Sequence, residues 1–435
     1  MALVLVAVYG CGRSALPPLP GRTTGPPAIE ADEVVGPRLS TITREPMVRV
    51  RVAAGVDEVV LTPTSGGRAL RMSTPGGEAS RRLAPPVRVW SLGQAFRIES
   101  GDGRRGTWRR DTLVVESDPA LGVAIDGTAY PGTIVLHADG QDASATRPTL
   151  DAINHVGLET YLPGVLEKEL FPHWHRRAFE AQAIAARSYA IFEHGRRSSQ
   201  RFDVESTTVS QVYGGKAKNP TAIAAARATR GLVLVYDGRV VPAFYSSSAG
   251  GRGQDGAVAF PNMADLPPLR GRDHLGWGSQ SPAYRWGPVT RHAATLSRRL
   301  AAWGERRGHA VASLGRLADI AVIERSRTGR PAVFRLTDTA GRRFDLPCET
   351  FRHACNFAAD GDPARRLPAL ARDDRLKSSD VAINRVGPGF AFTGRGHGHG
   401  VGMDQYGAQH LATTGYPALD IVSFYYPSAA AVRAY

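Results

Sequence analysis

Residues 158–190 read Leu158-Glu-Thr-Tyr-Leu-Pro-Gly-Val-Leu-Glu-Lys-Glu-Leu-Phe-Pro-His-Trp-His-Arg-Arg-Ala-Phe-Glu-Ala-Gln-Ala-Ile-Ala-Ala-Arg-Ser-Tyr-Ala190, and two apolar stripes run through them. One stripe is formed by Leu162, Val165, Leu166 and Leu170, and the other by Ala178, Ala181, Ala185, Tyr189 and Phe192. Apolar residues at this spacing are typical of amphipathic helices. Pro172 lies between the stripes and should break the helix, because proline lacks the backbone N–H, and Gly195 is a stop signal. The pattern predicts a helical hairpin.

Short β-branched runs precede the hairpin, and Gly- and Asp-rich turns separate them as in a small sheet domain. They are Val48–Val52, Glu58–Leu61, Val87–Trp90, Thr112–Val115 and Thr133–Leu136. After the hairpin we expect strands at 232–235 and 240–241, a loop-rich segment from 246 to about 287, a helix over 293–307 and strands from 320 to about 344. A Gly/His-rich loop, Gly394–Gly402, then leads into a helix from 403 to about 413.

These elements predict an α+β fold with a β-rich N-terminal region, a central helical hairpin, further strands and a Gly-rich C-terminal loop followed by a helix. We expect residues 1–36 to form a signal-like segment and a Pro/Gly-rich linker. Residues 37–153 would be the β-rich part, and residues 154–435 the core that carries the site. Within that core, residues 252–310 have the character of an insertion.

The composition narrows the class of protein. The chain has 435 residues, 42% of them hydrophobic, which excludes wholesale disorder, and no apolar run approaches the roughly 18 residues of a membrane-spanning helix. Its net charge is +14, with 54 basic and 40 acidic residues, and only four of the basic residues are lysines. The arginines are scattered in short pairs and form no basic stripe, so a nucleic-acid partner is not expected. An anionic polymer such as cell wall fits this charge.

The N-terminus indicates export. Ala2–Val8 is a short apolar run followed by Tyr9-Gly10-Cys11, which resembles the cleavage box of a bacterial lipoprotein. The segment lacks the usual positive charge, and Tyr9 is bulky for such a box. We expect an extracytoplasmic, cell-envelope protein, with Cys11 as the candidate lipid anchor. Cys348 and Cys355 could pair in an oxidising compartment or remain buried thiols, and the sequence leaves both readings open.

Glu169 is the first candidate for catalysis. It follows Val165 by four residues and Leu166 by three, so it projects from the apolar face of the first predicted helix. A carboxyl group held against apolar surface has a raised pKa, as a general acid needs near neutral pH. The alternative is a helix-edge glutamate in an ion pair with Arg176 or Arg187.

Other polar groups give weaker signals. Gln182, Arg187 and Ser188 fall among the apolar residues of the second stripe, where buried polar side chains need hydrogen-bond partners. The Gly394–Gly402 loop contains His397 and His399, but two ligands without a nearby third make a poor metal site. We therefore expect a tight structural or substrate-binding loop with no metal. The sequence carries neither a nucleophile elbow nor a phosphate loop.

Taken together, the chain resembles the SpoIID/LytB family, typified by stage II sporulation protein D. The resemblance is carried by residues 158–165, Glu169, residues 178–190, Ser210-Gln-Val-Tyr-Gly214, residues 229–236, Ala243-Phe-Tyr-Ser-Ser-Ser-Ala-Gly-Gly251, Ser281-Pro-Ala-Tyr-Arg-Trp286, residues 394–408 and Phe424-Tyr-Tyr-Pro427. These blocks occur in order and, with the weakly patterned β region before them, cover about 380 residues.

The resemblance implies an enzyme acting on peptidoglycan. Family members of the sporulation type are lytic transglycosylases that cut the bond between N-acetylmuramic acid (MurNAc) and N-acetylglucosamine (GlcNAc), without a cofactor. The family's catalytic glutamate falls on Glu169, and its block arginine on Arg187, which would stabilise developing charge or hold a substrate group unless it forms a structural ion pair. The residues expected to bind substrate are Gln182, Gln211, Tyr213, Tyr245, Tyr284, Trp286, His399, Gln405 and Tyr406. The LytB branch implies the alternative: a non-catalytic peptidoglycan-binding activator of a cell-wall amidase.

The chain departs from the family pattern at several positions. The proline that usually comes directly after Met in the family's Glu-Met-Pro is displaced by one position in Leu170-Phe171-Pro172. His397 stands where tryptophan is usual, and Asp404 replaces a common serine. Residues 201–209 hold neither the cysteine nor the histidine that bind zinc in some members, so we expect no zinc there.

Overall fold

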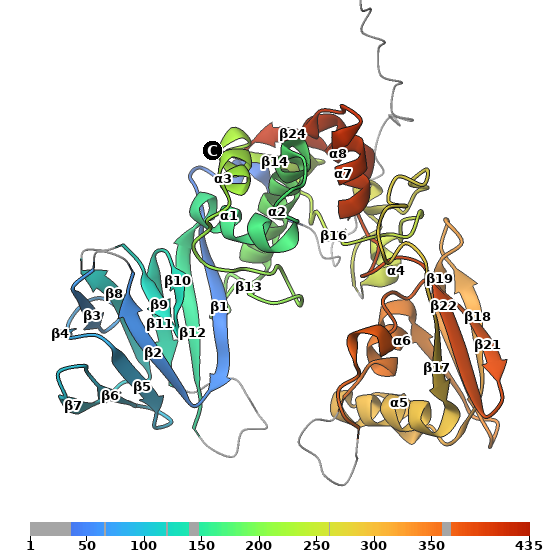
Figure 1. Cartoon of the computed structure of the whole chain (residues 1–435), viewed down its shortest axis with the longest axis horizontal. Coiled ribbons are helices and arrows are strands. Elements are labelled where there is room, and N and C mark those ends of the chain that lie inside the picture. The colour runs from blue at the N-terminus through green and yellow to red at the C-terminus, as the bar shows by residue number, and fades with distance from the viewer. Residues whose placement is uncertain (1–35, 65–66, 119–120, 139–147, 261, 359–366) are drawn as a thin grey trace, which may run out of the picture.

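The computed structural model describes residues 36–435 except 65–66, 119–120, 139–147, 261 and 359–366. The predicted signal segment and Cys11 lie outside the described residues. Two sheets form the N-terminal part, at the left of Figure 1. Their strands are β1 (Met47–Val56), β2 (Glu58–Pro63), β3 (Ala69–Ser73), β4 (Ser80–Leu83), β5 (Val87–Ser91), β6 (Phe96–Glu99), β7 (Arg105–Trp108), β8 (Thr112–Asp118), β9 (Val123–Ile125), β10 (Thr128–Tyr130), β11 (Thr133–His137), β12 (Leu150–Gly157) and β13 (Val204–Glu205).

The strand order is β13-β1-β12-β11-β8-β3-β4 in one sheet and β10-β9-β2-β5-β6-β7 in the other. Buried side chains from both sheets, such as Leu61, Val89, Leu113 and Leu136, belong to one hydrophobic cluster. The alternating burial along β2 and β5 explains why periodicity identified these strands, and all five predicted runs lie within observed strands. The α+β prediction with a β-rich N-terminal region is therefore confirmed.

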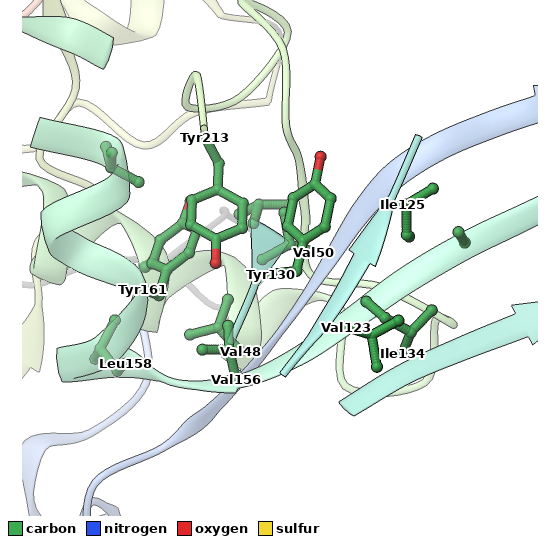
Figure 2. Packing of buried hydrophobic residues seen from close by; sticks show 14 of the residues in the cluster. Val48, Val50, Val123, Ile125, Tyr130, Ile134, Val156, Leu158, Tyr161 and Tyr213 are labelled. Atoms are coloured by element: carbon green, nitrogen blue, oxygen red, sulfur yellow. The ribbon is translucent and has the colours of Figure 1, made fainter. Parts of the chain in front are cut away.

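The predicted helical hairpin is present. Strand β12 runs directly into α1 (Leu158–Glu169), and α2 (Arg176–Arg196) follows after a short loop that contains Pro172. At the start of α2, Nδ1 of His175 accepts the N–H of Arg177, an N-terminal cap. The tyrosine rings of Tyr130, Tyr161 and Tyr213 pack where α1 meets the sheets, as Figure 2 shows. These contacts fix the hairpin to the N-terminal sandwich.

A second hydrophobic cluster lies on the other side of α2, at the top of Figure 1. It is built around a small sheet of order β15-β14-β24 and two C-terminal helices. The elements of this part are α3 (Pro220–Ala228), β14 (Leu232–Tyr236), β15 (Arg239–Val240), β16 (Tyr245–Ser246), α4 (Gly256–Ala259), β23 (Met403–Asp404), α7 (Gln405–Thr413), α8 (Ala418–Tyr425) and β24 (Ala430–Arg433). Strands β16 and β23 pair in parallel, which brings Tyr245 beside Met403, two residues before Gln405.

The right-hand part of Figure 1 has its own hydrophobic cluster, which runs from Trp286 to Phe392 in sequence. Its elements are β17 (Trp286–His292), α5 (Ala293–Arg307), β18 (Leu317–Arg325), β19 (Pro331–Asp338), β20 (Arg343–Pro347), α6 (Cys348–Cys355), β21 (Val381–Val386) and β22 (Gly389–Gly394). Two three-stranded sheets, β17-β22-β21 and β18-β19-β20, make up this part. The insertion-like stretch expected around residues 252–310 contains only the first two of these elements, β17 and α5. The right-hand part continues to the end of β22. Short 3-10 helices occur at Leu39–Thr41, Pro267–Leu269, Ala310–Ser313 and Arg372–Asp374.

Cys348 and Cys355 are buried free thiols. They lie seven residues apart at the two ends of α6, so about 10 Å of helix rise separates them, beyond the span of a disulfide. The structure therefore resolves the pairing that the sequence left open. Within the described residues, no helix has the length and apolar character needed to cross a membrane.

Candidate active site

Glu169 is the last residue of α1 and is partly buried. Its Oε1 accepts a hydrogen bond of 2.9 Å from the backbone N–H of Val212, and its Oε2 accepts one of 3.2 Å from Nε2 of Gln405. The two arginines that were considered as its ionic partners pair elsewhere. Arg176 contacts Glu180 at 2.9 Å, and Arg187 contacts Glu159 at 2.9 Å. The ion-pair alternative for Glu169 is therefore wrong.

The surroundings of Glu169 favour its protonated form. Burial raises the pKa of its carboxyl group, and the hydrogen bonds from Val212 and Gln405 oppose this rise without cancelling it. Both donors are uncharged, so they stabilise the carboxylate less than a guanidinium would. A raised pKa is the direction that a general acid requires, because the carboxyl group then keeps its proton to higher pH.

Gln182 and Gln405 form an amide pair beside this carboxyl group. Nε2 of Gln405 lies 3.5 Å from Oε1 of Gln182, a long contact, and 3.2 Å from Glu169. Nε2 of Gln182 is buried and has no hydrogen-bond partner among the described residues. Asp404 fixes the start of α7, because its Oδ1 caps Gly407 and its Oδ2 accepts the N–H of Ala249. The structure thus brings together Glu169, Gln182 and Gln405 from three helices.

Gln211 and Tyr245 support the same carboxyl group. Gln211 is fully buried, accepts from the Tyr161 hydroxyl at 3.1 Å, and donates to the Tyr245 hydroxyl at 3.0 Å and to the Ala186 carbonyl at 3.2 Å. It therefore fixes the backbone next to it, whose Val212 N–H holds Glu169. Burial raises the pKa of Tyr245, and the negative charge of Glu169 adds to the rise, which places Tyr245 in the electrostatic range of Glu169.

An aromatic cluster follows Glu169 directly. Phe171, which is 49% exposed, and Trp174 pack against Tyr406, with ring centroids 6.2 and 5.0 Å away. The backbone N–H of His175 donates to the side chain of Gln409 at 2.8 Å, which ties this loop to α7. Sequence reasoning identified Tyr406 but missed Phe171 and Trp174. Their signal was two large aromatic residues in the loop immediately after the candidate acid.

Arg187 requires a correction. Its side chain is completely buried, and Nε and Nη2 each donate to one carboxyl oxygen of Glu159 at 2.9 Å. The remaining N–H groups reach backbone carbonyls of Ala226 and Leu232 at 3.2 and 3.1 Å, with longer contacts to Ala183 and Thr229. With every donor used inside the protein and no surface exposed, Arg187 has no donor left for substrate. The structural ion pair that was expected as the alternative is therefore present, and Arg187 has no free donor for the catalytic role expected of it.

Two of the aromatic residues expected to bind substrate are structural. Tyr213 is buried in the core, where its hydroxyl donates to Asn154 at 3.1 Å and its ring packs on Tyr161, as Figure 2 shows. Trp286 is 8% exposed, and its indole N–H donates to the carbonyl of Gly396 at 2.8 Å. A Cβ on Gly394 would lie 2.2 Å from the Trp286 ring, so the glycine permits this close approach. Trp286 therefore anchors the glycine-rich loop.

The loop Gly394–Gly402 is held mainly by its backbone. The N–H of His397 donates to the Ser248 carbonyl at 2.7 Å, and the N–H of Ser248 donates back at 3.2 Å. His399 packs edge-on against the rings of Phe244 and Phe260, and its Nδ1 accepts from the N–H of Val401 at 3.0 Å. Burial lowers the pKa of His399 to about 4, so it is neutral at pH 7. These contacts hold His399 in the loop, and its substrate-binding role stays a prediction.

Among the described residues, no three His, Cys, Asp or Glu side chains come together as metal ligands would. Of two cavities in the described part of the chain, one contains a residue expected to bind substrate. One, of about 570 Å³, lies between the edge strands β4 and β7 of the two N-terminal sheets. The other, of about 660 Å³, is lined by Tyr284 and four arginines. Glu169 lines neither cavity, so Tyr284 does not belong to the immediate surroundings of Glu169.

Comparison with known proteins places part of the chain, including Glu169, in a described family model. The family model of stage II sporulation protein (SpoIID) matches residues 146–236, which include Glu169, α1 and α2. Stage II sporulation protein D of Bacillus subtilis is 26% identical over 68% of this chain and 81% of its own length. An uncharacterized protein of Brachyspira hyodysenteriae is 27% identical over 70% of this chain and 73% of its own length.

The amidase enhancer of Bacillus subtilis is 25% identical over 61% of this chain, which spans only 39% of that relative's length. The matched segment, the α1–α2 hairpin and these relatives support membership of the SpoIID family.

Proposed function

We propose that this protein is an exported lytic transglycosylase that cuts the MurNAc–GlcNAc bond of peptidoglycan, with Glu169 as the single general acid and base, in cell-wall remodelling. The observation that carries the proposal is the environment of Glu169. Its carboxyl group has a raised pKa, two neutral hydrogen-bond donors and an adjacent aromatic cluster in which Phe171 is half-exposed. Sugars pack on aromatic faces, so Phe171 and Tyr406 are the surface on which a glycan would lie.

The reaction needs only one carboxyl group. Protonated Glu169 donates its proton to the glycosidic oxygen, the bond from that oxygen to C1 of MurNAc breaks, and GlcNAc leaves with a free 4-hydroxyl. Positive charge develops on the MurNAc ring in an oxocarbenium-like transition state. The ionised Glu169 then takes the proton of the MurNAc 6-hydroxyl, whose oxygen bonds to C1. The product is a 1,6-anhydro sugar, Glu169 is protonated again, and no water is consumed.

The other acidic residues of α1 are engaged elsewhere, which supports a one-carboxyl mechanism. Glu159 pairs with Arg187, and Glu167 accepts the backbone N–H groups of Lys218 and Asn219. Ordinary glycosidases place a second carboxyl group within about 5 to 10 Å of the first to activate water or attack the sugar. Intramolecular attack by the 6-hydroxyl removes that requirement.

Glu169→Gln tests the proposal, with Glu167→Gln on the same helix as the matched control. The amide introduced at position 169 can still accept the Val212 N–H, and a flip of the Gln405 and Gln182 amides would restore their contacts, so the fold should persist. Release of anhydromuropeptides from purified cell wall should fall to background for Glu169→Gln and stay at the wild-type level for Glu167→Gln. Unchanged release by Glu169→Gln would contradict the proposal.

The second candidate function is a non-catalytic activator of a cell-wall amidase, and the similarity to a relative named amidase enhancer favours it. In that case the protein would bind glycan strands and accelerate the amidase without producing anhydro ends. Adding Glu169→Gln protein to an amidase assay separates the two functions, because an activator would keep its effect. The +14 charge would aid encounter with the anionic wall in either case.

A further inference from the structure

The cavity of about 660 Å³ that contains Tyr284 is lined by four guanidinium groups. They belong to Arg252, Arg272, Arg327 and Arg395. Asp273 is the acidic residue of the lining, and its Oδ1 accepts the backbone N–H of Leu275 at 2.7 Å. Such a concentration of arginine around one concave surface is typical of sites that hold anions, because guanidinium matches carboxylate geometry.

Three of the four arginines are already held by the protein. Arg252 donates to both oxygens of Asp380 at 2.6 and 2.9 Å, and Arg327 contacts Asp255 at 2.6 Å. Arg272 donates to the Phe424 carbonyl at 2.8 Å and lies over the Phe424 ring. These bonds fix the positions of the cationic groups.

The remaining arginine and the tyrosine are unengaged. Among the described residues, no hydrogen bond or ion pair is made by the guanidinium of Arg395 or by the hydroxyl of Tyr284. Two glycines allow the chain to pass close to both residues. A Cβ on Gly250 would lie 2.5 Å from Cβ of Arg395, and one on Gly251 would lie 2.5 Å from the Tyr284 hydroxyl. Both glycines also have positive φ, so the Gly250-Gly251 pair is required to bring the chain along this wall.

This wall is linked to the Glu169 site by a short segment of chain. The carbonyl of Ser247 accepts the N–H of Tyr406 at 3.3 Å, next to Gln405, and Gly251 lines the cavity four residues later. Those four residues span at most about 14 Å of extended chain. A strand bound at Glu169 could therefore place a neighbouring unit at the cavity.

We propose that this cavity is a carboxylate-binding subsite in which Arg395 and Tyr284 hold an anionic group of the glycan strand bound at Glu169. The inference rests on the proposed function for the identity of the strand. Two groups of peptidoglycan have this chemistry: the lactyl carboxylate of MurNAc in strands without peptides, and the carboxylates of the peptide stem in intact strands. Arg395 and Tyr284 contact this group, and Arg252 keeps the cavity cationic.

Binding without cleavage tests the proposal. Full-length Glu169→Gln protein would be titrated with glycan strands stripped of peptides, with strands that keep their peptides, and with neutral chitin oligomers. Adding Arg395→Gln or Tyr284→Phe should weaken binding to a carboxylate-bearing strand, about 10-fold or more for the arginine, because a charge-assisted hydrogen bond is lost. Binding to chitin oligomers should not change. The matched control is Arg285→Gln, an exposed arginine outside the cavity lining.

The pattern of loss identifies the source of the carboxylate. A loss confined to stripped strands assigns the lactyl group, and a loss confined to peptide-bearing strands assigns the stem. Equal loss for chitin, or no loss for any probe with an unchanged melting temperature, would overturn the subsite. If the wild-type protein cleaves no glycan but its binding depends on Arg395, the proposed transglycosylase activity is refuted. The proposed carboxylate-binding subsite is then still supported.

Discussion

The ion pair between Arg187 and Glu159 provides the most discriminating stability experiment. Arg187→Met removes a fully buried guanidinium that donates to both oxygens of Glu159 and leaves the carboxylate with the Gly231 N–H and the Tyr435 hydroxyl. Breaking a buried pair from one side costs about 3–5 kcal/mol, since an uncompensated charge stays inside the protein. Urea unfolding at pH 7, followed by circular dichroism, measures this loss.

A control and a double variant define the cause. Arg176→Gln on the same helix removes a pair in which the arginine is 57% exposed, and should cost at most about 0.5 kcal/mol. Glu159→Gln combined with Arg187→Met should unfold at higher urea than Arg187→Met alone, because neither charge is then left buried. The two substitutions would thus be strongly non-additive.

The loss of stability caused by Arg187→Met should also depend on pH. Burial opposes ionisation of Glu159, but the hydrogen bonds and charge of Arg187 outweigh it and hold the pKa of Glu159 below its ordinary value of 4.5. The stabilisation is therefore present above pH 4.5 and is lost as pH falls through the lowered folded-state pKa. The gap in stability between wild type and Arg187→Met should narrow in acid. Wild-type stability with abolished glycan cleavage in Arg187→Met would refute the structural role and restore a catalytic one.

Three further outcomes are expected. Gln405→Leu removes an N–H that favours the ionised form of Glu169, so the alkaline limb of the pH–rate profile should move to higher pH; an unmoved limb would exclude this coupling. Phe171→Ala should lower affinity for glycan strands several-fold in a binding titration and leave the melting temperature within about 2 °C, since the ring is half-exposed. Gly400→Ala should lower the melting temperature by several degrees, because its φ is +74° and a Cβ would lie 2.2 Å from the Arg330 guanidinium; an unchanged melting temperature would show that the loop relaxes.

The spacing of apolar residues was sufficient to predict the two helices that position Glu169. The stripes of residues 158–192 predicted both helices of the hairpin and the break at Pro172, because α1 buries its apolar face in one hydrophobic cluster and α2 packs between that cluster and a second one. The same spacing placed Glu169 on the apolar face of α1, where burial raises its pKa. These are local properties of the chain, so a single sequence carries them.

Side-chain partners that lie far apart in the sequence could not be predicted in the same way. Helix α2 is buried on nearly every face, so the pattern around Arg187 does not show which neighbour it meets. Its partner Glu159 lies 28 residues away, and the Tyr435 hydroxyl that completes the group lies 276 residues from Glu159. Likewise, Tyr213 and Tyr406 both lie in sequence blocks that resemble the family. Only the packing in the structure shows that Tyr213 belongs to the core and that Tyr406 lies beside the Glu169 site.

The central claim is that Glu169 breaks the glycan by intramolecular transfer, and digestion of purified cell wall in ¹⁸O-labelled water tests it most directly. Mass spectrometry of the products should show 1,6-anhydro ends without ¹⁸O for the wild-type protein and no products for Glu169→Gln. Reducing ends that carry ¹⁸O would identify a hydrolase, and intact wall with the wild-type protein would identify a binding module; either result would contradict the account.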